Sequence, residues 1–375
     1  MSEWKNCTLG DLGEVVGGGT PSTKKPEYYG GDIAWITPKD LSTFSGRFIK
    51  HGERNITEEG LKGSSARLMP KKTILFSSRA PIGYVAIAEN EVSTNQGFKS
   101  IVPNDDTDYL FLYYLLKFNK DKIENMGSGT TFKEVSGKTV KAIDVTVPSN
   151  KEKQHEIAKI LGSLDDKIEN NRKINHHLEQ IARSIFKSWF VDFNPFGGDV
   201  PASWNEELLF DLATVTYGKN LPTKKLLSSG YRVFGGNGQI GYYSEYLYKK
   251  ERILISCRGA ASGTVRLSRP YSFVTNNSLI VNEKEPELFA YLKEWSLNRQ
   301  FFDAVTGSAQ PQVTVDSLKL ISLPKPDKET LEKFTNLLMP IYNEIEANTT
   351  ECEKLVILRD TLLPKLMTGE ISVTD

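Results

Sequence analysis

The 375-residue sequence has few cysteines, no long apolar segment and no excess of charge of either sign. Its three cysteines, Cys7, Cys257 and Cys352, are widely separated and form no CxxC pair, which predicts a reducing compartment and no structural metal site. No apolar run approaches the roughly 18 residues of a membrane-spanning helix, and the N-terminus lacks a signal-peptide pattern. We therefore expect a cytoplasmic protein with no membrane partner.

Catalytic motifs are also missing. The glycine run at 17–19 is followed by Thr20-Pro21 and not by the Gly-Lys-Ser/Thr of a Walker A loop. Residues 194–196, Asn-Pro-Phe, resemble only part of the Asn-Pro-Pro-aromatic motif of adenine methyltransferases, and no Glu-x-Lys follows the Pro-Asp at 326–327. The four histidines have no catalytic partners in the sequence pattern. We predict that the chain is not an enzyme and binds no metal.

The sequence contains two copies of one plan, which is the strongest indication of its organisation. KKTILFSSRAPIGYVAIA at 71–88 matches KERILISCRGAASGTVRLS at 250–268, with one inserted residue, and this places Arg79 on Arg258. Further matches follow in the same order. They pair Thr94-Asn95 with Thr275-Asn276, YLFLYYLL from Tyr109 with ELFAYLKE from Glu287, Gly127-Ser128 with Gly307-Ser308, and Pro148 with Pro324.

Each copy combines a globular part with a long helix. Short β-branched and aromatic runs at 73–77 and 84–88, with one helix near 109–124 or 287–304, predict a mixed α/β domain. We therefore expect an α+β protein with a domain at 1–150, a spacer helix at 151–193, a second domain at 194–326, and a second spacer helix with a tail at 327–375.

The two long helices show heptad spacing of apolar residues, which is typical of a coiled coil. The second seam repeats the first after a shift of 177 residues, and Pro340 and Pro364 within it predict kinks or breaks. The first seam consists of Ile157, Leu161, Leu164, Ile168, Leu178, Ala182, Ile185 and Trp189, and the second of Phe334, Leu338, Ile341, Ile345, Leu355, Leu362 and Leu366.

Polar residues interrupt both seams at the same height, at Asn171 and Asn175 in the first helix and at Asn348 and Cys352 in the second. They indicate either a buried polar layer that fixes the register or a notch open to solvent. Ile160, Ile174 and Ile181 widen the apolar stripe of the first helix beyond the seam. This edge is where we expect a partner protein to bind.

The positive charge is local. Residues 60–88 contain five basic and no acidic residues, and acid-free windows occur at corresponding places in the second copy. Such windows suit contacts with DNA phosphates, whereas base edges need Arg, Asn or Gln side chains. Any one of these residues could equally be an ordinary surface or turn residue. The candidates are Lys71, Lys72, Arg79, Asn95 and Gln96 in the first copy, and Lys219, Lys224, Lys225, Arg258, Asn276, Asn277, Gln310 and Gln312 in the second.

Several segments together resemble type I restriction-modification specificity subunits. They are GGGTPS (17–22), WITPKDL (35–41), ILFSSRAPIG (74–83), SGTTFKEVS (128–136), KQHEIAKILGSLDDKIENN (153–171), SIFKSWFVDF (184–193) and LRDTLLPKLMTGEI (358–371). This resemblance implies two tandem target-recognition domains joined by an antiparallel pair of long helices in a pseudo-two-fold arrangement, with the chain ends close together. Each domain would recognise one half of a split, asymmetric double-stranded DNA target.

The resemblance also implies partners and further contact residues. Two modification subunits would dock on the helices and methylate adenine with S-adenosylmethionine, and restriction subunits would supply ATP-driven translocation and cleavage. S-adenosylmethionine, ATP and magnesium would then belong to the partner subunits. Lys24, Lys25 and Lys133 would lie near DNA in the first domain, whereas the second copy reads NLPTKK and GSAQPQVTV at these places. Identical domains would recognise a palindrome, so this divergence suits an asymmetric target.

Two other functions are compatible with parts of the sequence. A self-contained methyltransferase or nuclease would need the cofactor or metal motifs that are missing. A coiled-coil scaffold that binds only protein would not need basic windows in both globular parts. We therefore favour a DNA-recognition subunit.

Overall fold

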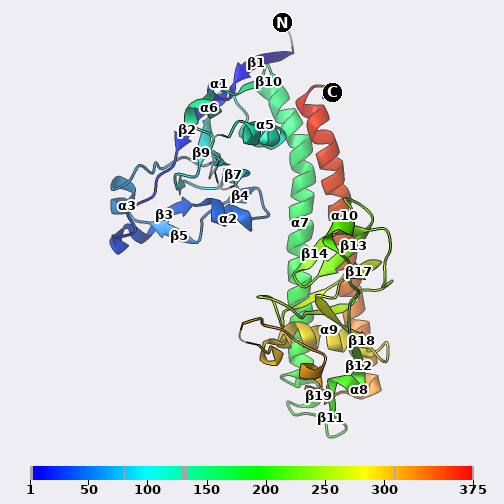
Figure 1. Cartoon of the computed structure of the whole chain (residues 1–375). Helices are drawn as coiled ribbons and strands as arrows, with labels where there is room; N and C mark the ends of the chain where they lie inside the picture. Colours follow the sequence, from blue (N-terminus) through cyan, green and yellow to red (C-terminus); the bar gives the residue numbers. More distant parts are fainter. Residues whose placement is uncertain (1–2, 80, 128–132, 308, 374–375) are drawn as a thin grey trace. The chain divides into compact units, whose positions relative to one another are not determined.

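The computed structural model describes residues 3–79, 81–127, 133–307 and 309–373. The chain forms two compact units, one of Met1–Arg172 with Thr349–Asp375 and the other of Lys173–Asn348. The long helices α7 (Lys151–Phe190) and α10 (Lys328–Met367) each contribute one part to each unit (Figure 1). None of the helices in the described part of the chain combines the length and the apolar character needed to span a bilayer.

The first unit contains three sheets with the strand orders β2-β9-β6-β7-β4, β5-β3-β8 and β1-β10. Its strands are β1 (Trp4–Thr8), β2 (Gly13–Gly17), β3 (Tyr29–Ile36), β4 (Phe48–Ile49), β5 (Arg54–Ile56), β6 (Ile74–Ser78), β7 (Ile82–Ala88), β8 (Ser93–Thr94), β9 (Lys99–Pro103) and β10 (Asp144–Pro148). Its shorter helices are α1 (Leu9–Leu12), η1 (Pro26–Tyr28), α2 (Pro38–Ser42), α3 (Glu58–Lys62), α4 (Tyr109–Phe118), α5 (Lys120–Asn125) and α6 (Gly137–Lys141).

The second unit repeats this plan with the orders β12-β18-β15-β16, β14-β13-β17 and β11-β19. Its strands are β11 (Asn205–Leu208), β12 (Ala213–Tyr217), β13 (Tyr231–Gly235), β14 (Gly238–Tyr243), β15 (Ile253–Ser256), β16 (Val265–Leu267), β17 (Ser272–Val274), β18 (Ser278–Glu283) and β19 (Ser322–Lys325). Its shorter helices are η2 (Asn194–Phe196), α8 (Leu209–Leu212), η3 (Thr223–Lys225), α9 (Leu288–Arg299), η4 (Phe302–Ala304) and η5 (Asp316–Leu318).

Strand registers agree between the units as well as strand orders. Val15 pairs with Ile101 in the β2-β9 ladder, and Val215 pairs with Val281 in the β12-β18 ladder. In both units a parallel pair, β3 with β8 or β13 with β17, stands beside this sheet. The internal repeat and the mixed α/β domains predicted from the sequence are confirmed.

The seam residues of the long helices are buried or half-buried, as predicted. The helices run antiparallel in each unit, since Ile157 and Leu161 share a core with Leu366 in the first and Phe190 packs edge-to-face against Phe334 in the second. Helix α10 is continuous from Lys328 to Met367, so the predicted breaks at its two prolines do not occur. Burial along the seam outweighs the hydrogen bonds that the prolines remove.

A buried polar layer interrupts the seam, and the solvated alternative is wrong. In the first unit Asn171 is fully buried and donates to Glu351, while the Cys352 thiol approaches the Ile168 carbonyl at 3.6 Å. In the second unit Asn175 donates to the Ile345 carbonyl at 3.2 Å. The shift of 177 residues relates the Asn175 contact to the Cys352 contact, so the repeat extends into the helices.

The chain ends belong to the same unit. Trp4 lies against the first-unit core, and its ring fills the space that a side chain on Gly369, just beyond α10, would need. Figure 1 shows β1 and the last turn of α10 near the start of α7. The proximity of the two ends, implied by the resemblance, is therefore observed.

Candidate nucleic-acid interface

Arg79 directly follows β6 and is held in a hydrogen-bonded frame. The Ser78 amide donates to the Gly97 carbonyl at 2.8 Å, and the Val135 amide donates to the Ser78 carbonyl at 2.9 Å. Arg79 itself pairs with Glu134 as an isolated antiparallel bridge. Three segments thus meet at the end of β6: the turn at 94–97, Arg79, and residues 133–135. We call this arrangement the first frame.

The second unit builds the same frame around Arg258. The Cys257 amide donates to the Asn277 carbonyl at 3.1 Å, and the Val313 amide donates to the Cys257 carbonyl at 3.1 Å. Arg258 forms an isolated antiparallel bridge with Gln312. The predicted equivalence of Arg79 and Arg258 is therefore confirmed by the backbone geometry, and Glu134 is the counterpart of Gln312.

The frame corrects the predicted pairing of the adjacent turns by one residue. The turn closes through the Phe98 amide and the Asn95 carbonyl in the first unit, and through the Ser278 amide and the Thr275 carbonyl in the second. Asn95 therefore corresponds to Thr275, and Asn276 corresponds to Gln96. The short polar sequences of both turns allow either alignment, whereas the hydrogen bonds allow only one.

The two frames differ in charge. Arg79 lies 3.4 Å from the Glu134 carboxylate, which is also 3.5 Å from Lys99. Arg258 is exposed, faces the neutral Gln312, and makes no ion pair within the described residues. The positive charge of the second frame is therefore available to a ligand, whereas that of the first is partly neutralised.

The other first-unit candidates near the frame have different roles. Asn95 accepts a hydrogen bond from the Gly97 amide at 2.9 Å, so it shapes the turn. Gln96 is exposed and contacts the Thr20 hydroxyl, which brings the loop that contains Lys24 and Lys25 to this surface. Lys25 donates to the Tyr28 hydroxyl at 2.9 Å, and this hydrogen bond raises the pKa of its ammonium.

Lys133 is exposed beside the same frame. The rest of its motif at 128–132, together with Ser308 of the second copy, lies outside the described residues.

Two first-unit candidates lie elsewhere. Lys71 and Lys72 precede β6, whereas Arg79 follows it, so they are separated from the frame by the length of the strand. The Lys72 ammonium stands 4.9 Å from the centre of the Tyr109 ring. These two lysines are exposed, but they do not share the surface that carries Arg79.

Several second-unit candidates lie at the Arg258 frame or at its turn. The Lys219 amide donates to the Val274 carbonyl at 2.9 Å and its carbonyl accepts from the Asn276 amide, so Lys219 lies on the turn that carries Asn276 and Asn277. Gln310 and Gln312 are exposed on the segment beside Arg258. Lys224 and Lys225 form the short helix η3, and both are exposed.

The predicted partner edge of α7 is only partly exposed. Ile174 and Ile181 are 37% and 47% exposed, whereas Ile160 packs against the first-unit core. Sequence reasoning missed the matching positions on α10. The shift of 177 residues relates Ile181 to Leu358, which is 45% exposed and adjoins the exposed Ile357, and the same shift could have identified both.

The described residues contain no group of three or more His, Cys, Asp or Glu side chains placed to hold a metal ion. The frames and the loops around them instead present arginine, lysine and amide side chains. This chemistry suits contacts with phosphates and base edges.

Comparison with known proteins agrees with this chemistry. The family described as "Type I restriction modification DNA specificity domain" matches residues 1–180 and 201–355. The chain belongs to this family. It is 36% identical to the type I restriction enzyme MjaIX specificity subunit of Methanocaldococcus jannaschii, over 100% of this chain and 94% of that protein.

More distant relatives match over nearly the same extent. The type I restriction enzyme HindI specificity subunit of Haemophilus influenzae is 24% identical, over 99% of this chain and all of that protein. The crystal structure of the type I restriction-modification S subunit from M. genitalium has a TM-score of 0.62 at 20% identity, and the alignment covers 97% of this chain and 96% of that one. The fold of this type I specificity subunit therefore matches that of a solved S subunit.

Proposed function

We propose that this specificity subunit recognises a bipartite, asymmetric double-stranded DNA target, with each globular domain contacting one half. The observation that supports this best is the repeated arginine frame. A shared backbone frame provides a common docking geometry, while Glu134 in one copy and Gln312 in the other give each domain a different set of contacts. Two different domains suit a target with two different halves.

The proposal assigns the chain a non-catalytic role in a larger complex. Two modification subunits would dock on the long helices and supply adenine methylation, and restriction subunits would complete the assembly. The exposed apolar residues Ile174, Ile181 and Leu358 support docking on the helices, because a partner would remove them from water. S-adenosylmethionine, ATP and magnesium would bind those partners.

The test is co-expression with the neighbouring modification subunit, followed by mapping of methylated adenines across genomic DNA with and without this chain. We expect a split motif with two methylated adenines that appears only when the chain is present. Stable assembly without sequence-dependent methylation would contradict the proposal and favour a protein-binding scaffold.

A further inference from the structure

An arginine from each globular domain contacts its long helix at the same height. In the first unit Arg47 lies against α7, with its Nε 2.9 Å from the Glu169 carboxylate. In the second unit the Arg269 guanidinium lies 2.7 Å from the Glu346 carboxylate on α10. Glu169 and Glu346 each lie 18 residues after the first residue of their helix. We call these two ion pairs the helix clamps.

The Arg47 clamp is directional and largely removed from water. Arg47 is 4% exposed, and its guanidinium contacts Asp166 and both oxygens of Glu169. Its backbone amide donates to Glu169 at 3.1 Å, and its carbonyl accepts from the Ile87 amide of β7 at 2.8 Å. One residue therefore joins the edge of the large sheet to the helix.

The two arginines reach equivalent places from different parts of the chain. Arg47 precedes β4, which pairs with β7, whereas Arg269 follows β16, the counterpart of β7. The two glutamates therefore occupy equivalent positions of the repeat, whereas the two arginines do not. Because an arginine–glutamate ion pair forms at the same helix position from two different segments, a functional role for this position is favoured over chance packing.

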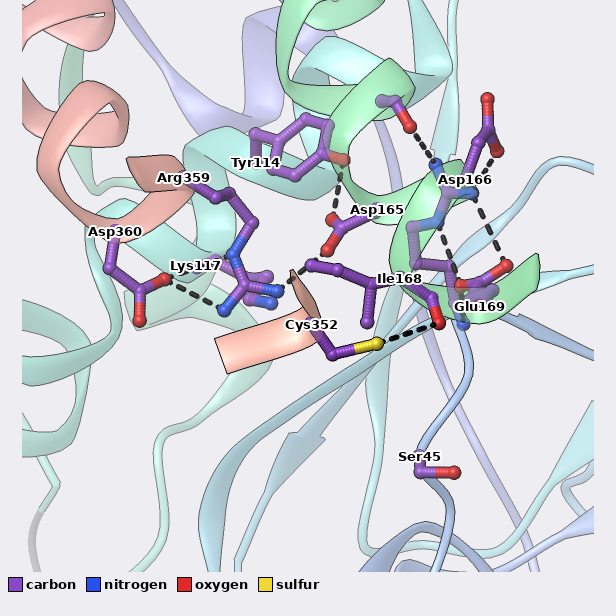
Figure 2. Close-up of polar contacts among 12 residues, drawn as sticks. Ser45, Tyr114, Lys117, Asp165, Asp166, Ile168, Glu169, Cys352, Arg359 and Asp360 are labelled. Atoms are coloured by element: carbon purple, nitrogen blue, oxygen red, sulfur yellow. Dashed lines mark hydrogen bonds and ion pairs between the residues drawn. The ribbon is translucent and has the colours of Figure 1, made fainter. Parts of the chain in front are cut away.

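A second pair of equivalent helix positions reinforces each clamp. In the first unit Asp165 accepts from the Tyr114 hydroxyl at 2.7 Å and from Arg359 of α10 at 2.6 Å (Figure 2). Its counterpart on α10 is Tyr342, which donates to Glu294 of α9 at 2.7 Å. Each domain is thus attached to its helix at two points, and two points restrict rotation about either one.

We infer that Arg47, Glu169, Arg269 and Glu346 are positioning residues that fix the angle of each recognition domain on its helix, and thereby the gap between the two half-sites. This inference rests on the proposed function. One added base pair moves a half-site by about 3.4 Å and turns it by roughly 35° around the DNA axis. Contacts at two points of the helix resist a domain rotation of that size. The Arg47 guanidinium is buried and Arg269 is mostly buried, so each arginine needs its carboxylate partner in place, and an arrangement that separates them is disfavoured.

The experiment uses the assembled methyltransferase and a library of split targets in which only the gap length varies. The main variant is Glu169→Gln with Glu346→Gln, which keeps side-chain size and removes the glutamate charge of each clamp, while Asp166 still contacts Arg47. Glu329→Gln is the matched control. Glu329 lies on α10 and makes an exposed ion pair with Lys333, and among the described residues no hydrogen bond or ion pair joins it to a globular domain.

We expect the double variant to lower the ratio of methylation at the natural gap to methylation at gaps one base pair longer or shorter by about tenfold. The bases preferred within each half-site stay unchanged, and Glu329→Gln behaves as the wild type. Should the double variant fail to assemble, Arg47→Lys, which keeps the charge but loses the bidentate geometry, is judged by the same ratio.

An unchanged gap preference in these variants, or an equal loss of rate at every gap length, would overturn the inference while leaving the proposed function intact. A wild-type complex that methylates no split motif would overturn the proposed function and the inference with it.

Discussion

The two units share a backbone plan but differ in side-chain chemistry at two matched places. At the end of the strand, Arg79 is paired with Glu134, whereas Arg258 faces Gln312. At the end of the helix, α7 packs Phe186 and Phe190 into the second-unit core, whereas α10 packs Leu366 and Met367 into the first. The backbone hydrogen bonds of the frame are therefore repeated in both units. The side chains exposed at the frame and the side chains that fill the core at the helix ends differ between the units.

The largest expected effect concerns the helix ends. Phe190 contacts Phe334 and Tyr291 with ring centres 4.8 Å apart, so Phe190→Ala leaves a cavity and should cost about 3–5 kcal/mol of second-unit stability. Met367→Ala, the matched first-unit change, should cost about 2 kcal/mol because the core around a flexible side chain closes more easily. Denaturant-dependent hydrogen exchange in each unit measures both, and equal losses would contradict the comparison.

The next effect concerns the two arginines. Arg258→Ala should weaken binding of the assembled complex to its target by about 1–3 kcal/mol if Arg258 contacts a base. Arg79→Ala should cost about 1 kcal/mol, because Glu134 already neutralises part of its charge. Fluorescence anisotropy on target and random DNA measures both. Equal losses on the two DNAs would show that these arginines contact only phosphates.

Exchanging the residues that face the arginines sharpens the same comparison. Glu134→Gln gives Arg79 a neutral partner like that of Arg258 and also removes the carboxylate beside Lys99. It should tighten binding to random DNA and steepen the salt dependence of that binding by about one released counterion. Gln312→Glu should do the reverse in the second frame. Salt titrations of both variants are the measurement, and changes of the same sign would show that charge at the frames does not govern DNA affinity.

The smallest effect concerns a buried carboxyl group. Asp165 in the first unit has both Tyr114 and Arg359 as partners, whereas burial raises the pKa of Glu294 in the second. The folded state therefore holds the Glu294 proton more tightly than the unfolded state. The stability that this tightly held proton provides is fully present below the unfolded-state pKa of about 4.3. It is lost as the pH rises through the raised pKa of Glu294 in the folded state.

Glu294→Gln removes this dependence. The free energy of unfolding of the variant should exceed that of the wild type by on the order of 1 kcal/mol at pH 8, and the difference should vanish near pH 4. Unfolding measured across this range tests the sign. A variant that is less stable at pH 8 would contradict it.

Much of the fold follows from strong periodic patterns in the sequence. The heptad spacing predicted a spacer helix at 151–193, and α7 begins at Lys151 and ends at Phe190; the repeat correctly paired Arg79 with Arg258. The break predicted at Pro340 does not occur, because packing along the whole of α10 outweighs the local effect of one proline. The turn at 94–97 was misaligned because polar turn residues carry no periodicity.

The candidate site was less predictable, because it depends on contacts between distant segments. Glu134 neutralises Arg79 across 55 residues of sequence, and composition windows cannot detect such a partner. Charge windows also grouped Lys71 and Lys72 with Arg79, although strand β6 separates them. The helix clamps were not predicted at all, since Arg47 and Arg269 occupy different positions in the two copies.

The central claim is that each unit recognises its own half of one DNA target. The most direct test maps the methylated motif for two multiple-alanine variants, one at Arg79 and Gln96 and one at Arg258, Gln310 and Gln312. We predict that the first relaxes base preference in one half of the motif only, and that the second relaxes it only in the other half. Relaxation of the same half by both variants, of both halves by either one, or of neither half would contradict the claim.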